Sequence, residues 1–421
     1  MGLRIMNKSA LIIFSMISAL LLKSPFGYAA AEMTVTLSTG DDITIKRYPA
    51  SGNYLMLWLA PEYGFRDTHR TMAQKISEQG IEVWQCNLLE SLFLTQTTSS
   101  IRQLDNNYVA DLIENAHQNT GKKIVMTGDS YAALNVLGGI NQWQQRDPHN
   151  TYLTGAILFT PYTFASIPPL GGTPDYMPVV SATNVPVMIY QARNSPIYSQ
   201  FGTLLSKLRI NNNTVYSRIM PEMMSLYYEN PPTRAMVEQA ETIPVNVKQM
   251  IRLLDTHTPP RQAIPLPVSI SVKSGIDIQL KKMDHRPMPT LSLNDINGNR
   301  VTKTDYRGKV TLINFWATWC PPCVEEIPSL NRLQQKMKGQ PFEIISINYA
   351  EDTSEIRRFM EKVAIEFPVL LDMNGDFARD LNVISYPSTF VIDSSGKISY
   401  GVNAAIEWDS PEQIKKLKSL Y

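Results

Sequence analysis

The feature that most constrains the fold of this chain is a pair of cysteines between a predicted buried strand and a predicted helix. Lys309–Trp316 is a short apolar run typical of a buried strand, and Cys320–Met337 has helical spacing. Cys320 and Cys323 stand at the start of that helix, where free N–H groups and the positive end of the helix dipole stabilise a thiolate. The arrangement predicts that Cys320 is the attacking nucleophile and that Cys323, one turn further, resolves a mixed disulfide.

A zinc half-site or a structural disulfide could also account for the cysteine pair. A structural zinc site needs four ligands, and this region offers no second cysteine pair and only His285 nearby. The third cysteine, Cys86, is expected to be a small buried residue, with thiol exchange with Cys320 as the alternative. We therefore predict a redox-active Cys320–Cys323 disulfide, no metal and no other cofactor.

Composition and charge exclude several classes of protein. Of the 421 residues, 43% are hydrophobic and 18% are charged, which is enough apolar material for two or three folded domains and too little charge for a disordered chain. Lysine and arginine number 39 against 38 aspartate and glutamate, which gives a formal net charge of +1. A chain without a basic excess or a basic block is not expected to bind nucleic acid.

The first 31 residues have the three-part layout of a secretory signal peptide. Arg4 and Lys8 form a positive start, Ala10–Leu22 is an uncharged apolar run, and the small residues Ala29–Ala31 suit a signal peptidase. The run is shorter than the about 20 residues of a membrane span. We expect residues 1–31 to be removed, leaving a soluble exported, periplasmic protein; an uncleaved anchor is the alternative. In an oxidising compartment, a lone cysteine pair favours a redox-active dithiol.

A proline-rich stretch divides the rest of the chain. His257–Pro267 holds four prolines in eleven residues, which favours an extended, semi-rigid linker. We place a linker at residues 256–275, between one domain at 32–255 and a second at 276–421. Both regions alternate predicted strands with predicted helices, so the expected fold class is α/β.

The first domain is expected to hold a mostly parallel sheet covered by helices on both faces, because its short apolar runs are continuous. The predicted buried strands are 54–60, 81–86, 123–127, 152–159, 185–190 and 214–220, and the predicted helices are 71–79, 101–117 and 132–143. Two earlier segments, 34–37 and 43–46, alternate as in an antiparallel edge hairpin. In the second domain, the further predicted elements are strands at 342–348, 367–371 and 389–393, and helices at 354–363 and from Ser410 onward.

From Asp284 to Tyr421, several separate motifs resemble the TlpA/ResA-like family of exported thiol–disulfide oxidoreductases. The motifs are Leu291–Asp295 with Gly298, Gly308–Val310, Asn314–Cys323, Glu325–Pro328 and Tyr386–Phe390. This resemblance implies a thioredoxin fold and thiol–disulfide oxidoreductase activity. It also implies a reductant of client protein disulfides, such as those of apocytochrome c or copper-site proteins, fed by a membrane thiol electron donor.

The resemblance assigns roles to residues around the cysteines. Pro387 matches the family's cis-proline, and the backbone of Tyr386 would pair with a client strand, with Trp319 as a further client-binding residue that packs on the motif. An ordinary loop proline is the alternative. Glu326 matches an acidic residue that could handle the proton of the second cysteine, or else it is a solvated helix glutamate. Asn314 stands where thioredoxins carry a buried aspartate, so proton handling by that aspartate is absent here.

The first domain carries a weaker motif. Gly128–Ala132 follows a predicted strand and precedes a predicted helix, as in the nucleophile elbow of α/β-hydrolases, with Ser130 at the nucleophile position. Trp58–Gly64 is similar to the strand and turn that supply an oxyanion-hole donor. Together with the strand order, these segments resemble an α/β-hydrolase fold over most of the domain. The full expectation is a hydrolase-like, mostly parallel sheet domain followed by a thioredoxin-fold domain.

The partners of the serine are missing from the expected loops. No carboxylate occurs at Ala192–Pro196, where the acid would follow its strand, and no histidine occurs at Pro221–Ser225, where the base would lie. His69, near the oxyanion turn, is the one histidine that could pair with Ser130. We expect a degenerate hydrolase domain that serves in binding or docking. The alternatives are an esterase-like serine hydrolase using Ser130, with an accessory thioredoxin domain, and a binding module without thiol turnover.

Overall fold

The computed structural model describes residues 30–149, 151–223, 233–257, 262–267 and 279–421. The predicted signal segment, 1–31, lies outside these residues except for its last two positions, and the predicted linker, 256–275, lies partly outside them. Both therefore stay predictions. No helix within the described ranges is long and apolar enough to cross a membrane.

The N-terminal region is built on an eight-stranded sheet in the order β1-β2-β4-β3-β5-β6-β7-β8. The strands are β1 (Ala31–Thr36), β2 (Asp42–Tyr48), β3 (Tyr54–Leu59), β4 (Glu82–Cys86), β5 (Lys123–Asp129), β6 (Leu153–Phe159), β7 (Val187–Ala192) and β8 (Val215–Met220). Strands β3 to β8 run parallel to one another, while β2 is antiparallel to both β1 and β4. The predicted mostly parallel sheet and its antiparallel edge hairpin are confirmed.

Alternate side chains of these strands pack into two separate cores, one on each face of the sheet. Leu55, Leu57 and Leu59 of β3 join one core, and Met56 and Trp58 join the other. Helices close both cores with their apolar sides. They are α1 (Asp67–Glu78), α2 (Leu88–Ser91), α3 (Thr98–Gln103), α4 (Asn106–Thr120), α5 (Ala132–Arg146), α6 (Pro178–Ala182), the 3-10 helix η1 (Pro196–Gln200), α7 (Phe201–Leu208), α8 (Arg234–Glu241) and α9 (Ile243–Leu254).

One predicted helix of this region is wrong. The sequence pattern predicts a single helix over 101–117, whereas the structure has two, α3 and α4. The backbone is extended at Leu104 and Asp105, between them. The Asp105 side chain accepts a hydrogen bond from the Asn107 N–H at 2.9 Å and so caps α4. A capping residue inside an apolar pattern thus ends one helix and begins the next.

The C-terminal region is built on a second eight-stranded sheet, in the order β11-β10-β14-β13-β12-β15-β16-β9. The strands are β9 (Lys281–Lys282), β10 (Ser292–Asp295), β11 (Arg300–Thr302), β12 (Val310–Trp316), β13 (Phe342–Tyr349), β14 (Val369–Asp372), β15 (Ser388–Ile392) and β16 (Ile398–Val402). The helices are α10 (Lys303–Tyr306), α11 (Pro321–Lys336), α12 (Thr353–Met360), α13 (Asp376–Asp380) and α14 (Pro411–Lys418). Strand β12 pairs parallel with β13 and antiparallel with β15. The strands predicted in this region are confirmed to within two residues.

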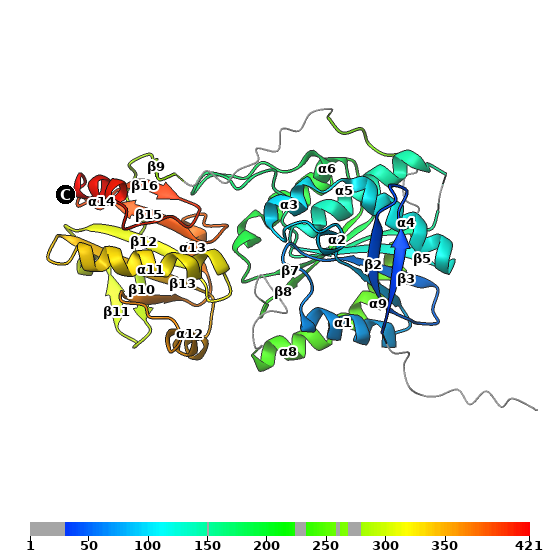
Figure 1. The fold of residues 1–421 in the computed structure, drawn as a ribbon, viewed down its shortest axis with the longest axis horizontal. Helices are drawn as coiled ribbons and strands as arrows, with labels where there is room; N and C mark the ends of the chain where they lie inside the picture. Colours follow the sequence, from blue (N-terminus) through cyan, green and yellow to red (C-terminus); the bar gives the residue numbers. More distant parts are fainter. Residues whose placement is uncertain (1–29, 150, 224–232, 258–261, 268–278) are drawn as a thin grey trace, which may run out of the picture.

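The two regions lie against each other (Figure 1). In that view the blue-to-green N-terminal region is at the right and the yellow-to-red C-terminal region is at the left. Phe164 and Ile197 of the first region pack with Ile384 of the second in one small core. Phe164 follows β6, Ile197 follows β7, and Ile384 precedes β15. The carboxyl ends of two parallel strands therefore face the loop that enters β15.

Candidate active site

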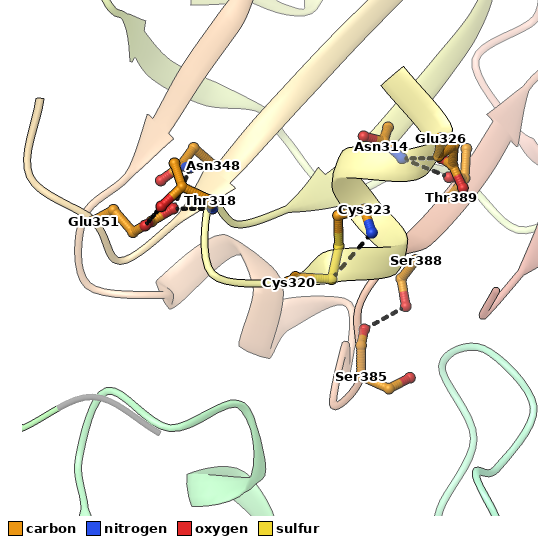
Figure 2. Close-up of a disulfide and its surroundings, with 10 residues drawn as sticks. All are labelled: Asn314, Thr318, Cys320, Cys323, Glu326, Asn348, Glu351, Ser385, Ser388 and Thr389. Carbon is orange, nitrogen blue, oxygen red and sulfur yellow. Dashed lines mark hydrogen bonds between the residues drawn. A yellow bond between two sulfur atoms is a disulfide. The ribbon is translucent and has the colours of Figure 1, made fainter. Parts of the chain in front are cut away.

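The two cysteines lie where strand β12 passes into helix α11. The strand ends at Trp316, and Cys320 is the N-cap residue of the helix. Cys320 and Cys323 form a disulfide with their Cα atoms 5.3 Å apart, and the Cys323 N–H donates to Cys320 Sγ at 3.3 Å (Figure 2). Pro321 and Pro322 occupy the first two helical positions and donate no N–H, so the Cys323 amide is the first helix donor to the sulfur. Both cysteines are buried, with Cys320 4% and Cys323 2% exposed.

A buried carboxyl group lies one helical turn beyond Cys323. Glu326 is 3% exposed, and its Oε1 accepts a hydrogen bond from Asn314 Nδ2 at 2.8 Å. The same amide nitrogen donates to Thr389 Oγ1 at 2.9 Å, so β12 and β15 together fix the amide that holds the carboxyl. Burial raises the pKa of Glu326 to about 8, and the hydrogen bond from Asn314 opposes part of that rise. The solvated-helix alternative for Glu326 is therefore wrong, and its carboxyl group can exchange a proton near neutral pH.

A second buried carboxyl group, which the sequence pattern does not reveal, holds the loop before Cys320. Glu351 follows β13, and its Oε2 accepts hydrogen bonds from the Thr318 N–H at 2.7 Å and from Asn348 Nδ2 at 2.6 Å. Its Oε1 accepts a further hydrogen bond from the Thr318 hydroxyl. Burial raises the pKa of Glu351, while these hydrogen bonds lower it in part. Glu351 thereby ties the loop that leads into the disulfide to the neighbouring strand (Figure 2).

Tyr386 and Pro387 lie beside the disulfide. The Tyr386–Pro387 peptide bond is cis, as the family resemblance implies. The Tyr386 ring meets the Trp319 ring edge-on at 6.0 Å between centroids and lies 5.0 Å from the Tyr349 ring. Trp319 and Tyr386 also pack against the cluster that contains both cysteines. The residues predicted to bind clients are thus gathered at the disulfide, while their role in binding stays a prediction.

The serine of the N-terminal region has the backbone conformation of a sharp turn. Ser130 lies between β5 and α5 with φ of 51°, in the left-handed region that residues other than glycine rarely adopt. Its Oγ donates to Glu62 Oε1 at 3.0 Å, and both side chains are buried. Glu62 lies within the segment assigned to the oxyanion turn, but its contact with the serine is not evident from the sequence.

His69 lies close to this turn, but its ring faces other groups. Its Nε2 is 3.0 Å from Asp129 Oδ2, and its Nδ1 accepts the Arg66 N–H at 3.0 Å. Because Nδ1 accepts a hydrogen bond, we assign the proton of the neutral ring to Nε2, which donates it to Asp129. His69 therefore pairs with the residue before Ser130, and a carboxylate, that of Glu62, receives the Ser130 hydroxyl.

The remaining candidate groups have partners or surroundings of their own. Cys86 is fully buried in β4, and burial raises the pKa of its thiol, which favours the small-hydrophobe interpretation. His285, considered above as a zinc ligand, hydrogen-bonds to Asp393 Oδ2 at 2.7 Å. In the described part of the chain, no group of three or more His, Cys, Asp or Glu side chains is arranged to hold a metal ion.

Comparison with known proteins identifies the family of the C-terminal region. The Redoxin family model matches residues 283–417. The thiol-disulfide oxidoreductase ResA of Bacillus thuringiensis subsp. konkukian is 32% identical over 132 residues, which are 31% of this chain and 76% of the relative. The chain belongs to the ResA family.

A second relative agrees with this assignment. ResA of Bacillus subtilis is 36% identical over 110 residues, which are 26% of this chain and 62% of that protein. Among solved structures, that of a putative thiol:disulfide interchange protein DsbE from Chlorobium tepidum is 28% identical, covers 34% of this chain and 99% of its own, and has a TM-score of 0.31. The family model and the ResA relatives make this protein a thiol–disulfide oxidoreductase with a ResA-like, thioredoxin-fold domain in its C-terminal region.

Proposed function

We propose that this protein reduces the disulfides of client proteins through Cys320 and Cys323. In the reduced protein, the Cys320 thiolate attacks a client disulfide, which forms a mixed disulfide and releases one client thiolate. The Cys323 thiolate then attacks the Cys320 sulfur, so that the second client thiolate leaves and the Cys320–Cys323 disulfide forms. Two electrons pass to the client, and an external thiol donor reduces the disulfide again. The position of Cys320 at the start of α11, with the Cys323 N–H on its sulfur, carries this proposal.

We assign Glu326 to the proton of Cys323. Cys323 must lose its proton before it attacks, and a free thiol has a pKa of about 8.5. A carboxyl group whose pKa is raised to about 8 lies close to the thiol in pKa, so its ionised fraction can accept that proton and return it. Glu326 lies three residues after Cys323, on the same side of the helix. Asn314 keeps the carboxyl in place by its hydrogen bond.

The direction of electron flow, the clients and the location rest on the family resemblance. Relatives named ResA are thiol–disulfide oxidoreductases. For this chain we propose clients with disulfides or thiols, such as apocytochrome c or copper-site proteins, and a membrane thiol donor. The signal-like pattern of residues 1–31 supports export to the periplasm.

For the N-terminal region, we propose a hydrolase-like domain that serves in binding or docking. The strand order and the positive φ of Ser130 support the hydrolase-like fold. The carboxylate of Glu62 is a weaker base than an imidazole, which argues against activation of the serine for acyl transfer. A serine hydrolase with an accessory thioredoxin domain is therefore not favoured.

A mixed-disulfide trap tests the redox proposal. Cys323→Ser should accumulate clients linked to Cys320, because the resolving thiol is gone, and mass spectrometry of the adducts then names the clients. Cys320→Ser should form no adducts and should not reduce insulin. If Cys323 were the residue alkylated first in the reduced protein at low pH, the assigned roles would be wrong.

A further inference from the structure

The contact between the N-terminal region and the ResA-like domain lies on the face where clients are expected to bind. Its apolar centre, called here the interdomain core, consists of Phe164, Ile197 and Ile384, each at most 4% exposed. Phe164 and Ile197 come from the segments that follow β6 and β7, whereas Ile384 lies two residues before Tyr386. The loop that should pair with a client strand is therefore already packed against the N-terminal region.

Side-chain hydrogen bonds also join the two regions. Asn382 Nδ2 donates to the Gly172 carbonyl at 2.6 Å, and Asn382 Oδ1 accepts from Gln200 Nε2 at 3.0 Å. Asn403 Nδ2 donates to the Pro168 carbonyl at 2.8 Å. Each of these bonds joins the two regions, so the contact fixes one mutual orientation.

Two of the contact residues also support the client loop. Asn403 Oδ1 accepts a hydrogen bond from Ser388 Oγ at 2.8 Å, one residue after the cis-proline. The Tyr349 hydroxyl donates to the backbone carbonyl of Asn194 in the N-terminal region, and the Tyr349 ring lies 5.0 Å from that of Tyr386. The interface and the client face thus share side chains.

Two polar atoms of the client loop are buried without partners. The hydroxyl groups of Tyr386 and Ser385 are shielded from solvent, and neither has a hydrogen-bond partner among the described residues. In Figure 2, Cys320 and Ser385 lie on the side of the domain that is turned toward the green loops of the N-terminal region. Unpaired buried hydroxyls are unfavourable, and water or a client backbone would pair them if the contact opened. A small apolar core combined with several polar bonds is typical of interfaces between domains that can move apart.

We propose that the N-terminal region is a cover docked on the client face of the ResA-like domain, and that protein clients reach Cys320 when the interdomain core separates. A small disulfide needs access to one sulfur atom, whereas a client strand needs the whole backbone edge beside Tyr386. The cover therefore controls protein clients and leaves small disulfides unaffected. This inference rests on the proposed reductase function and adds a control of access to it.

Substitutions at Ile197 test the cover in the full-length protein without changing any residue of the dithiol or of the client loop. Ile197→Asp places a charge in the interdomain core, and Ile197→Ala is the milder variant if the first fails to fold. Ile140→Ala is the matched control for Ile197→Ala. Ile140 is an isoleucine of the same region with the same 3% exposure, but it lies in the core that contains Leu55 and Leu57, away from the interdomain core. The readouts are the reduction rates of insulin and of oxidised glutathione, and the labelling rate of the reduced dithiol by a polyethylene-glycol maleimide.

The cover predicts a selective effect. Ile197→Asp should speed insulin reduction and polymer labelling by about tenfold, the factor given by about 1.4 kcal/mol of lost contact energy, and leave glutathione reduction within about twofold of wild type. Ile140→Ala should behave as wild type. If the wild type reduces both substrates, unchanged or slower insulin reduction in Ile197→Asp, or equal acceleration of both substrates, would overturn the cover. Labelling needs no turnover, so faster labelling in a protein that reduces neither substrate would support the cover and count against the reductase function.

Discussion

Glutamine in place of Glu326 should make the oxidised protein more stable at neutral pH. Burial disfavours the charged carboxylate and raises its folded-state pKa from 4.5 to about 8. Between these values the unfolded chain releases the proton while the folded protein retains it. Wild-type stability is therefore lost as the pH rises through this range, and glutamine, which does not titrate, escapes the loss.

The size of this effect follows from the shift in pKa. Each unit is worth about 1.4 kcal/mol, so near pH 7, about two and a half units above the ordinary value, the loss is about 3 kcal/mol. Near pH 5 it falls below about 1 kcal/mol. The glutamine side-chain oxygen can still accept the hydrogen bond from Asn314, so the substitution removes the titrating group and keeps this contact.

Urea unfolding of the full-length oxidised protein, at several pH values between about 5 and 8, measures the difference. Glu325→Gln is the matched control, because Glu325 is the neighbouring residue on the same helix and is not buried. The reasoning is refuted if the stability gap between wild type and Glu326→Gln stays constant over this range, or if the control shows the same trend. In the reduced protein, Glu326→Gln should also slow disulfide exchange, because the proton acceptor for Cys323 is gone.

Two further substitutions probe buried groups near and far from the disulfide. Glu351→Gln should slow insulin reduction, because the amide cannot accept all the hydrogen bonds that Thr318 and Asn348 donate and therefore holds the loop before Cys320 less firmly; an unchanged reduction rate would make Glu351 dispensable. Cys86→Ala should leave the insulin-reduction rate as in wild type, because the thiol is fully buried in β4; a clear fall in that rate would support exchange with Cys320.

The elements that carry the disulfide could be predicted because each depends on a local pattern. The continuous apolar run of β12 is typical of a buried strand, and the cysteine pair follows it at the start of a helical repeat. The antiparallel hairpin β1–β2 could be predicted because apolar and polar residues alternate along its segments. The sequence pattern does not reveal the break between α3 and α4, because one capping aspartate outweighs an otherwise helical apolar pattern.

The contacts of the two missed glutamates could not be predicted, because their partners are distant in the sequence. Glu351 holds Thr318, which is 33 positions away, and Glu62 receives the hydroxyl of Ser130, which is 68 positions away. Helical spacing relates residues three or four positions apart, whereas these pairs meet because the sheet order brings their strand ends together. The sequence pattern also leaves the surroundings of Glu326 undecided, because only the packed sheet shows which side of α11 is buried.

The sequence pattern could not predict the interdomain core either. Phe164, Ile197 and Ile384 are apolar residues outside the strands, and such a residue can pack into its own domain or against another. Composition does not distinguish these cases. The arrangement of the two sheets does, because it brings the carboxyl ends of β6 and β7 to the loop that enters β15.

The same contact bears on the serine of the N-terminal region. The Tyr162 N–H donates to the Ser130 carbonyl at 3.0 Å, and the rings of Tyr131 and Tyr162 lie 5.2 Å apart. Tyr162 in turn packs against the interdomain core. A reagent that approaches Ser130 from this side must therefore pass the interface that covers the disulfide, and absence of labelling in wild type would not separate an inert serine from a covered one.

Fluorophosphonate labelling of both wild type and Ile197→Asp makes that separation. We expect no stoichiometric labelling of Ser130 in either protein, because the hydroxyl donates to the Glu62 carboxylate and the His69 ring is engaged by Asp129. Mass spectrometry of the labelled peptide gives the readout, with Ser130→Ala as the control in each background. Labelling that appears in Ile197→Asp and disappears with Ser130→Ala would contradict the degenerate-domain proposal, and its loss in a further His69→Ala variant would make the histidine the base of a serine hydrolase that the cover conceals.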